Sequence, residues 1–395
     1  MSYPYRSKTL DRLGVRSWVN ASNWSTVLGG TWIPGYVLDA MHEVSRTFVD
    51  MFELLARVDE HIARLCQVED AHVVSGAGAA IELAVAGCLA GNDFGKWSKL
   101  PNVDGMKNEV AMPRGHYIAY TPQWAASGAK IVEYGQAGSL RSITNELESA
   151  MNEKTCCLSY TVSYNVVPRG MIPLEEVIGA GKRHNIPVVV DAASMLPPVS
   201  NLHRFIDMGA DVVCFSGGKA IQGPNNTGMM LGSGKGADII KAVRDHSFPH
   251  EGWGRGHKIS KEQIVGLAVA LEEFVKTGDS LYEKQMAVAE YFMKQLGDIP
   301  GLQVSIIPND DTYHEHVSMP HVPRVKIEWD TNAMGFSAVD LDRHMASEDP
   351  PVILRKGIYF DYYTNKSWRL IDTFYLREEE VLLIARRLKE KFTRI

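Results

Sequence analysis

The chain has 395 residues, of which 45% are hydrophobic and 22% are charged, and its formal net charge is −6. This composition is that of an ordinary globular protein, not of a disordered or fibrous chain. Nucleic-acid backbones are bound mainly by neutralising their phosphates, so this acidic chain is expected to have no nucleic-acid partner. No apolar run approaches the length of a membrane span, and no membrane partner is expected either.

The first quarter of the chain is predicted to be mainly helical. Thr31 can cap a helix, Pro34 suits a first helical turn, and apolar residues recur at helical spacing over residues 37–65. A strand at 71–74 then runs into a turn of small residues at 75–80, and a helix is predicted over 81–89.

Between residues 110 and 231, short apolar runs alternate with helical patterns. Strands are predicted at 110–112, 130–134, 156–162, 188–190, 212–215 and 229–231, and helices at 143–151, 174–184 and 205–209. Continuous apolar strands that alternate with helices favour an α/β fold, with a mostly parallel sheet covered by helices on both faces.

Beyond residue 259 the pattern changes to two helices and then to half-exposed strands. The helices are predicted at 259–276 and 281–296, the strands at 304–307, 325–328, 358–360 and 369–371, and two covering helices at 338–345 and 377–392. We therefore expect three segments: an N-terminal segment with a large cofactor domain over 1–258, connecting helices over 259–300, and a small C-terminal α+β domain over 301–395.

Two strand ends carry the residues that point to chemistry. An apolar run ends at Asp191, and the next run passes through a Ser-Gly-Gly turn to Lys219. Pyridoxal phosphate needs this pair: a lysine amine to hold its aldehyde, and a carboxylate to keep its ring nitrogen protonated. We therefore expect an enzyme that acts on an amine substrate.

Other small and polar residues are expected around the same sheet edge. A Gly-rich turn that opens a helix offers free N–H groups to a phosphate, and this chain has one after residue 74. Ligands of open parallel sheets bind at the carboxyl ends of the strands. The candidate cofactor-binding residues there are Ser75, Gly76, Ala77, Gly78, His116, Asp191, Ser194, Ser216 and Lys219, with His116 placed to stack on the ring.

On these residues the chain resembles the fold-type-I pyridoxal phosphate enzymes, in the branch that contains selenocysteine synthase and D-glucosaminate-6-phosphate ammonia-lyase. The pattern Ser-Gly-x-Lys-x-x-x-Gly-Pro around Lys219 is the most specific match. The matching stretches are spread over nearly the whole chain, at residues 13–22, 113–116, 191–193, 215–224, 254–262 and 350–355.

The resemblance implies roles for individual residues. Lys219 would carry the cofactor, Asp191 would pair with its ring nitrogen, and His116 would stack on the ring; these three are the expected catalytic residues. Gly256 would approach the cofactor of a neighbouring subunit, which implies a homodimer or a higher homo-oligomer. Family members carry a carboxylate-binding Arg where this chain has Phe374, so Arg355 and Arg369 are the candidates for binding the substrate.

The resemblance implies an ammonia-lyase that acts on a hydroxylated amino acid or an amino-sugar acid such as glucosaminate. A racemase or epimerase, an aldolase and a β-replacement enzyme remain open, because each can start from the same carbanion. A non-catalytic relative is the third alternative, although Lys219 and Asp191 are both present. No metal site is expected, since no histidine or cysteine spacing matches one.

The five cysteines lie mostly in apolar contexts and form no Cys-x-x-Cys pair. An odd number of core-like thiols is typical of a reducing compartment rather than of a disulfide framework. The first residues also lack a signal-peptide pattern. We therefore expect a cytoplasmic protein.

Overall fold

The computed structural model describes residues 6–136, 141–163, 171–307, 322–355 and 365–393. These residues form two units. The large unit contains the described residues between 33 and 279, and the small unit contains 6–32, 280–307 and the described residues from 322 onward. The N-terminal residues 6–32 therefore group with the C-terminal part of the chain. The expected division combined them instead with the cofactor domain, over 1–258.

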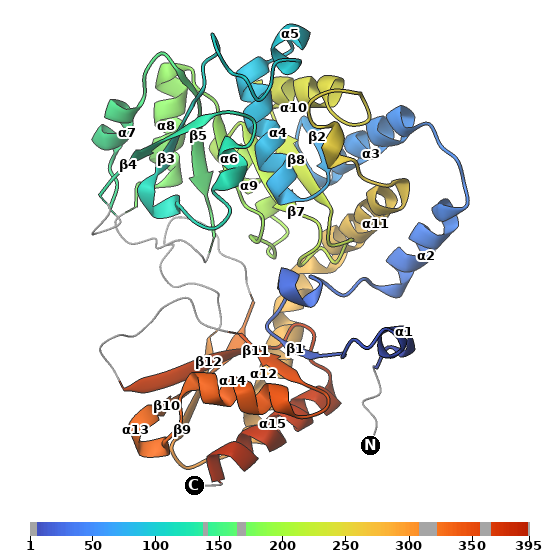
Figure 1. Ribbon diagram of the computed structural model, residues 1–395, viewed down its shortest axis with the longest axis vertical. Helices are drawn as coiled ribbons and strands as arrows, with labels where there is room; N and C mark the ends of the chain where they lie inside the picture. The colour runs from blue at the N-terminus through green and yellow to red at the C-terminus, as the bar shows by residue number, and fades with distance from the viewer. Residues whose placement is uncertain (1–5, 137–140, 164–170, 308–321, 356–364, 394–395) are drawn as a thin grey trace. The chain divides into compact units, whose positions relative to one another are not determined.

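The large unit is built on a seven-stranded sheet with the order β2-β8-β7-β6-β5-β3-β4 (Figure 1). Only β8 is antiparallel to its neighbours, so the mostly parallel sheet is confirmed. The strands are β2 (Asp70–Val74), β3 (Glu109–Pro113), β4 (Lys130–Tyr134), β5 (Thr155–Thr161), β6 (Val188–Asp191), β7 (Val212–Ser216) and β8 (Gly228–Gly232).

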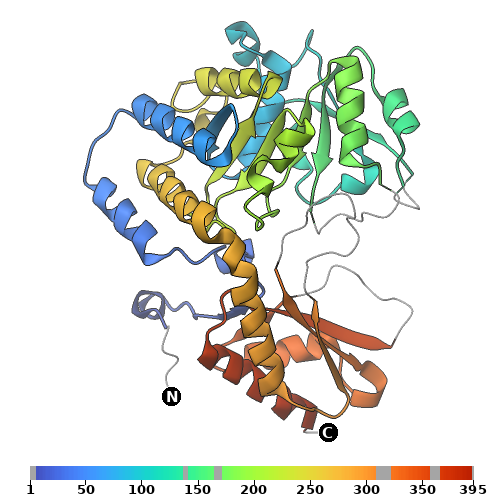
Figure 2. The same ribbon diagram turned by 180° about the vertical axis from the view of Figure 1, so that it is seen from behind.

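Helices cover both faces of this sheet, which is why its central strands are apolar along their whole length. Helices α4 (Ala77–Ala90) and α10 (Lys235–His246) pack together on the face seen in Figure 1. Helices α8 (Leu174–His184) and α9 (Asn201–Met208) lie on the face seen in Figure 2. Every residue of β3, β5 and β6 is buried as a result.

Further helices complete the large unit. They are α2 (Gly35–Ser45), α3 (Met51–Cys66), α5 (Phe94–Trp97), α6 (Pro122–Ala125), α7 (Thr144–Ala150) and α11 (Lys261–Thr277), with 3-10 turns η2 (Arg114–His116) and η3 (Arg255–His257). A further 3-10 turn, η4 (Gly278–Ser280), contains the point in the chain where the large unit ends and the small unit resumes.

The sequence predicted one helical pattern over 37–65, and the structure has two helices there, α2 and α3, separated by residues 46–50. Asp50 then caps α3, where its carboxylate accepts hydrogen bonds from the N–H groups of Phe52 (2.8 Å) and Glu53 (3.3 Å). An Asp at this position starts a new helix rather than continuing an old one.

The small unit contains an antiparallel sheet of order β12-β10-β9 and a parallel pair of β1 with β11. Val19 pairs with Val352 and Ala21 with Leu354, so the N-terminal segment belongs with the C-terminal strands. Its elements are α1 (Lys8–Arg12), β1 (Val19–Ala21), η1 (Thr26–Leu28), α12 (Leu281–Leu296), β9 (Leu302–Ile307), β10 (Arg324–Asp330), α13 (Thr331–Met334), α14 (Ala338–Ser347), β11 (Val352–Leu354), β12 (Lys366–Asp372) and α15 (Glu378–Thr393).

The predicted strands at 304–307, 325–328 and 369–371 are confirmed within β9, β10 and β12, and the strand predicted at 358–360 lies outside the described residues. Within the part of the chain that the structure describes, no helix is both long enough and apolar enough to cross a bilayer.

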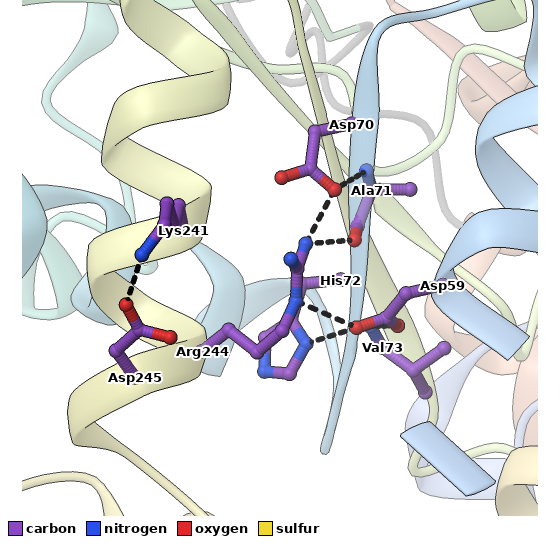
Figure 3. Close-up of polar contacts among 8 residues, drawn as sticks. All are labelled: Asp59, Asp70, Ala71, His72, Val73, Lys241, Arg244 and Asp245. Carbon is purple, nitrogen blue, oxygen red and sulfur yellow. Dashed lines mark hydrogen bonds and ion pairs between the residues drawn. The ribbon is translucent and has the colours of Figure 1, made fainter. Parts of the chain in front are cut away.

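A buried polar network anchors β2, the edge strand that leads into the Gly-rich turn (Figure 3). Asp59 of α3 accepts hydrogen bonds from the N–H of Val73 (2.9 Å) and from Nδ1 of His72 (2.7 Å). Arg244 of α10 reaches the same carboxylate at 3.3 Å and donates to the carbonyl of Ala71 at 3.1 Å. An edge strand exposes unpaired backbone groups, and here side chains from two helices bind them.

We predict that Asp59→Ala lowers the free energy of unfolding by about 3–5 kcal/mol, because it removes the acceptor shared by three donors in a buried ion pair. Asp59→Asn, which keeps one acceptor oxygen, should fall between this variant and the wild type. Asp245→Ala is the matched control, since its pair with Lys241 is exposed and is worth about 0–1 kcal/mol. Equal losses for Asp59→Ala and Asp245→Ala in urea denaturation would contradict the anchoring role.

Candidate functional site

The sheet brings the predicted catalytic residues of the large unit to one edge. Asp191 is the last residue of β6 and pairs in register with Cys214 of β7, five residues before Lys219. On the other side of β6, Asp191 pairs with Thr161 of β5. Because β5, β6 and β7 are parallel, their carboxyl ends meet at the same place.

The Gly-rich turn emerges beside the lysine turn because β8 joins their two strands. Gly228, the first residue of β8, pairs with Val74 of β2 on one side and with Ser216 of β7 on the other. A Cβ at Gly228 would lie 2.5 Å from the carbonyl carbon of Gly76 and 2.7 Å from the nitrogen of Ala77. Only glycine allows this approach, which sets the two turns side by side.

The first turn of α4 is suited to hold a phosphate. Gly76 is the N-cap with φ +114°, and it has no side chain to cap the helix, so the first N–H groups of α4 remain available for an anion. Gly78 is exposed in this turn. The helix begins at Ala77, four residues earlier than the sequence pattern indicated, and this places Ala77 and Gly78 in its first turn.

The chain around Lys219 is folded tightly. A Cβ at Gly217 would lie 2.2 Å from Oγ1 of Thr227, and one at Gly218 would lie 2.4 Å from Cα of Asn225. Gly217 donates its N–H to the carbonyl of Thr227 at 2.8 Å. The loop 223–228 therefore packs against both glycines, and the backbone that carries Lys219 is well defined.

Asp191 is held in a buried position, with 6% of its surface exposed. Its Oδ1 accepts a hydrogen bond from the N–H of Ala193 at 3.0 Å. Burial raises the pKa of the Asp191 carboxyl, while the bond from Ala193 and the positive charge of Lys219 act in the opposite direction. A buried carboxylate of this kind gains from a positively charged partner, and a protonated pyridine nitrogen is such a partner.

His116 lies in the 3-10 turn that follows β3, and only 2% of its surface is exposed. Its Nδ1 accepts a hydrogen bond from the N–H of Thr161 at 3.1 Å, which leaves the ring proton on Nε2. The ring meets Tyr160 edge to face, with a centroid distance of 4.6 Å. Since Thr161 pairs with Asp191, His116 is fixed next to the strand that carries the acid.

The other predicted cofactor residues occupy different settings. Ser194 is buried just beyond β6, and Ser216, which ends β7, is partly exposed. Gly256 lies in η3, where a Cβ would meet nothing within 4 Å. Its neighbour His257 pairs with Glu82 of α4 at 3.0 Å.

One residue beside the phosphate turn was missed by the sequence analysis. A Cβ at Gly78 would lie 3.3 Å from Cγ of Gln123, in the short helix α6. Oε1 of Gln123 is buried and has no hydrogen-bond partner among the described residues. A buried acceptor without a partner next to this turn fits a ligand group that donates a hydrogen bond to it. A lone glutamine in a four-residue helix carries no sequence signal of such a role.

The small unit holds the two arginines predicted to bind the substrate, in unlike settings. Arg369 makes a bidentate pair with Asp342, at 2.8 and 2.7 Å. Arg355 lies 3.7 Å from the buried Asp372, which pairs more closely with Arg324 at 2.9 Å. Phe374 packs edge to face on Trp24, with a centroid distance of 5.1 Å.

We predict that Asp191→Asn stabilises the cofactor-free protein at neutral pH. Because the folded-state pKa of Asp191 is raised above its ordinary value of 3.8, the carboxyl stabilises the fold below that value. It loses this contribution as the pH rises through the folded-state pKa. The variant should therefore melt above the cofactor-free wild type at neutral pH, and the difference should shrink in acid.

The matched control is Asp39→Asn, which changes an exposed aspartate of α2 and should leave the melting temperature nearly unchanged at both pH values. Thermal melts of both variants and the wild type at acidic and neutral pH provide the test. A cofactor-free Asp191→Asn protein that melts below the wild type at neutral pH would show that burial of the charge is not the dominant effect.

Comparison with known proteins agrees with this site. The chain is 29% identical to D-glucosaminate-6-phosphate ammonia lyase of Salmonella typhimurium over 96% of both chains. A solved structure titled D-glucosaminate-6-phosphate ammonia-lyase matches it with a TM-score of 0.79 and 28% identity over 98% of both chains. These matches confirm the predicted fold type and the pyridoxal phosphate cofactor.

A second relative carries another activity in its name. The 5'-C-glycyluridine monooxygenase-decarboxylase of a Streptomyces species is 31% identical, over 96% of this chain and 90% of its own. The model of the family described as aminotransferase class-V matches residues 35–328. Since this match covers the whole predicted site of the large unit, the chain belongs to the class-V aminotransferase family of pyridoxal phosphate enzymes.

Proposed function

We propose that this protein removes ammonia from a hydroxylated amino acid or an amino-sugar acid of the glucosaminate type and releases a keto acid. The observation that carries the proposal is the placement of Asp191 and Lys219 at the ends of neighbouring strands beside an uncapped helix N-terminus. The full-length similarity to an ammonia lyase supports the same reaction.

Each residue of the site has a separate role in binding the cofactor or moving a proton. Bound pyridoxal phosphate supplies an electron sink for negative charge that develops on the substrate α-carbon. The N–H groups at the start of α4 and the hydroxyl of Ser216 would bind the phosphate. Asp191 would pair with the ring nitrogen, and His116 would stack on the ring. Nζ of Lys219 takes the proton from the α-carbon.

Loss of the substrate's β-hydroxyl completes the elimination. Nζ of Lys219 gives the proton that it took from the α-carbon to the β-hydroxyl, which then leaves as water. The released enamine takes up one water and gives the keto acid and ammonium. Water is lost and regained, so the net change is the loss of ammonia.

We further propose that Arg355, more than Arg369, binds the substrate carboxylate. Both oxygens of Asp342 already engage Arg369 in a bidentate pair, which is the geometry that a substrate carboxylate would need for itself. Arg355 lies 3.7 Å from Asp372, a carboxylate that Arg324 approaches more closely, at 2.9 Å. The preference therefore rests on the occupied fork of Arg369.

A second candidate keeps the cofactor and changes the reaction. The Streptomyces relative is named for a monooxygenase and decarboxylase activity, and its similarity extends over as much of this chain as that of the lyase. This observation favours an oxygen-dependent loss of the carboxyl group. The racemase, aldolase and β-replacement alternatives have no comparable support.

The test measures ammonia, carbon dioxide and oxygen with D-glucosaminate and its 6-phosphate as substrates. The lyase should release ammonia without oxygen and without carbon dioxide, and Lys219→Ala should lower the rate by at least about 10²–10⁴-fold. Lys241→Ala, an exposed lysine on α10, should leave the rate unchanged. Carbon dioxide release that depends on oxygen would replace this proposal with the second candidate.

The same assay separates the two arginines. Arg355→Ala should raise KM by about 10–100-fold, as expected when a bound carboxylate loses a charged partner, while Arg369→Ala should mainly lower the melting temperature. The reverse result would assign the carboxylate to Arg369.

We propose that the protein is a homodimer in the reducing cytoplasm. The five cysteines are free thiols, and the large unit exposes several large apolar side chains on α2, at the start of α3 and in the segment between them. Exposed apolar surface of this kind suits protein contacts, and a second copy is the partner that the resemblance implies. The exposed residues are Tyr36, Leu38, Phe48, Val49 and Phe52, and Phe48 is fully exposed.

Light scattering of the purified protein should therefore give twice the mass of one chain. Phe48→Asp should shift the mass toward that of a single chain, because it replaces the most exposed of these apolar side chains by a charge. Val339→Asp, which changes an exposed residue of the small unit, should leave the dimer intact. A monomeric wild type would refute the dimer and leave the reaction proposal unaffected.

A further inference from the structure

Three thiols meet between α4 and β5, at the opposite end of these elements from the Gly-rich turn. Cys88 lies near the carboxyl end of α4, and Cys156 and Cys157 lie near the start of β5. Successive side chains of a regular strand point to opposite faces, so two adjacent cysteines would normally be separated by the sheet. Here they are not.

An irregularity in β5 explains why the thiols meet. Glu109 of β3 pairs with Thr155, but the next residue, Val110, pairs with Cys157, and Cys156 is left as an extra residue. Such a bulge redirects a side chain. Hydrogen bonds to Cys156 and Cys88, together with burial, raise the pKa of the Cys157 thiol. Cys88 packs against the buried hydrophobic cluster that contains Cys157, and this packing brings the third thiol to the other two.

A cavity of about 320 Å³ opens onto this cluster, with Cys88 and Cys156 in its lining. Cys88 is partly exposed, whereas Cys156 and Cys157 are 3% and 0% exposed. Of the two thiols that line the cavity, Cys88 is therefore the one that a small molecule there can reach, and Cys157 is not part of the lining.

The cavity carries more positive than negative charge. Lys107 and Lys235 line it together with one carboxylate, Asp238. The first turn of α10 also forms part of the lining. It comes close because α4 has glycine at 87, where a Cβ would lie 2.8 Å from Cγ2 of Ile239. Positive charge of this kind stabilises negative charge on a reacting sulfur.

We propose that Cys88 and Cys157 form a thiol pair that is oxidised by hydroperoxides to a disulfide. In the first step the sulfur of Cys88 attacks a peroxide oxygen, the O–O bond breaks, and Cys88 becomes a sulfenic acid while the peroxide is reduced to water or an alcohol. In the second step the sulfur of Cys157 attacks that of Cys88, and the oxygen leaves as water. Two thiols supply the two electrons that the peroxide accepts.

The test treats the purified holoprotein with hydrogen peroxide and maps its peptides without reduction. The expected product is a peptide pair joined between Cys88 and Cys157, lighter by two hydrogens, with two of the five thiols lost. Cys156→Ser should still form the link. Cys157→Ser should stop at a sulfenic acid on Cys88, which dimedone traps, and Lys235→Ala should slow the oxidation severalfold.

Cys66→Ser is the matched control, because Cys66 is a fully buried thiol of α3, and it should leave the product unchanged. Thiols that stay free while the protein keeps its native circular dichroism would overturn the proposal. So would a disulfide that still forms in Cys157→Ser, or one that involves Cys66. Since the readout is a covalent bond, its outcome is independent of the reaction that the enzyme catalyses.

Discussion

The close contact between Gly228 and the Gly76–Ala77 turn is the constraint on which the site depends. Strand β8 runs against the direction of its neighbours, and its first residue pairs with the ends of both β2 and β7. A phosphate-binding turn and a reactive lysine are thereby set on adjoining strand ends, although about 140 residues separate them along the chain. Any side chain at 228 would push the two apart.

The charges of the site are balanced against the burial that the fold imposes. Asp191 is buried by the same close packing of β5, β6 and β7 that places it beside His116 and Lys219. Burial of an acid without a full counter-charge is unfavourable, and the bond from Ala193 offsets only part of this cost. The buried carboxylate of Asp191 is therefore stabilised when a positively charged group binds next to it, and a protonated ring nitrogen is such a group.

Most of the large unit could be predicted from the sequence because its signals are local. The apolar runs that end at Asp191 and at Ser216 predicted buried strands, and the Gly-rich turn after Val74 predicted a helix N-terminus. Contacts between distant segments left no such signal. The pairing of β1 with β11, the Asp59 network and the position of Gln123 each depend on which elements become neighbours in space.

Predictions from local sequence patterns were wrong where a single residue interrupts a helix or a strand. The periodicity over residues 37–65 continued through Asp50, yet the carboxylate of that residue binds the N–H groups of a new helix. In β5, the apolar run indicated a regular strand, and the extra residue Cys156 became apparent only from its pairing with β3. Periodicity measures the average along a segment, and it does not detect a single interruption.

The pairing of Val19–Ala21 with Val352–Leu354 has a consequence for synthesis on the ribosome. The first strand of the small unit leaves the ribosome early, but its partner at 352–354 emerges only after the described large unit, residues 33–279, has been made. A contact between such distant segments forms late and slowly. The large unit can therefore fold before residues 19–21 have a strand to pair with. Loss of the last fifty residues would remove β11 and leave β1 without its β partner.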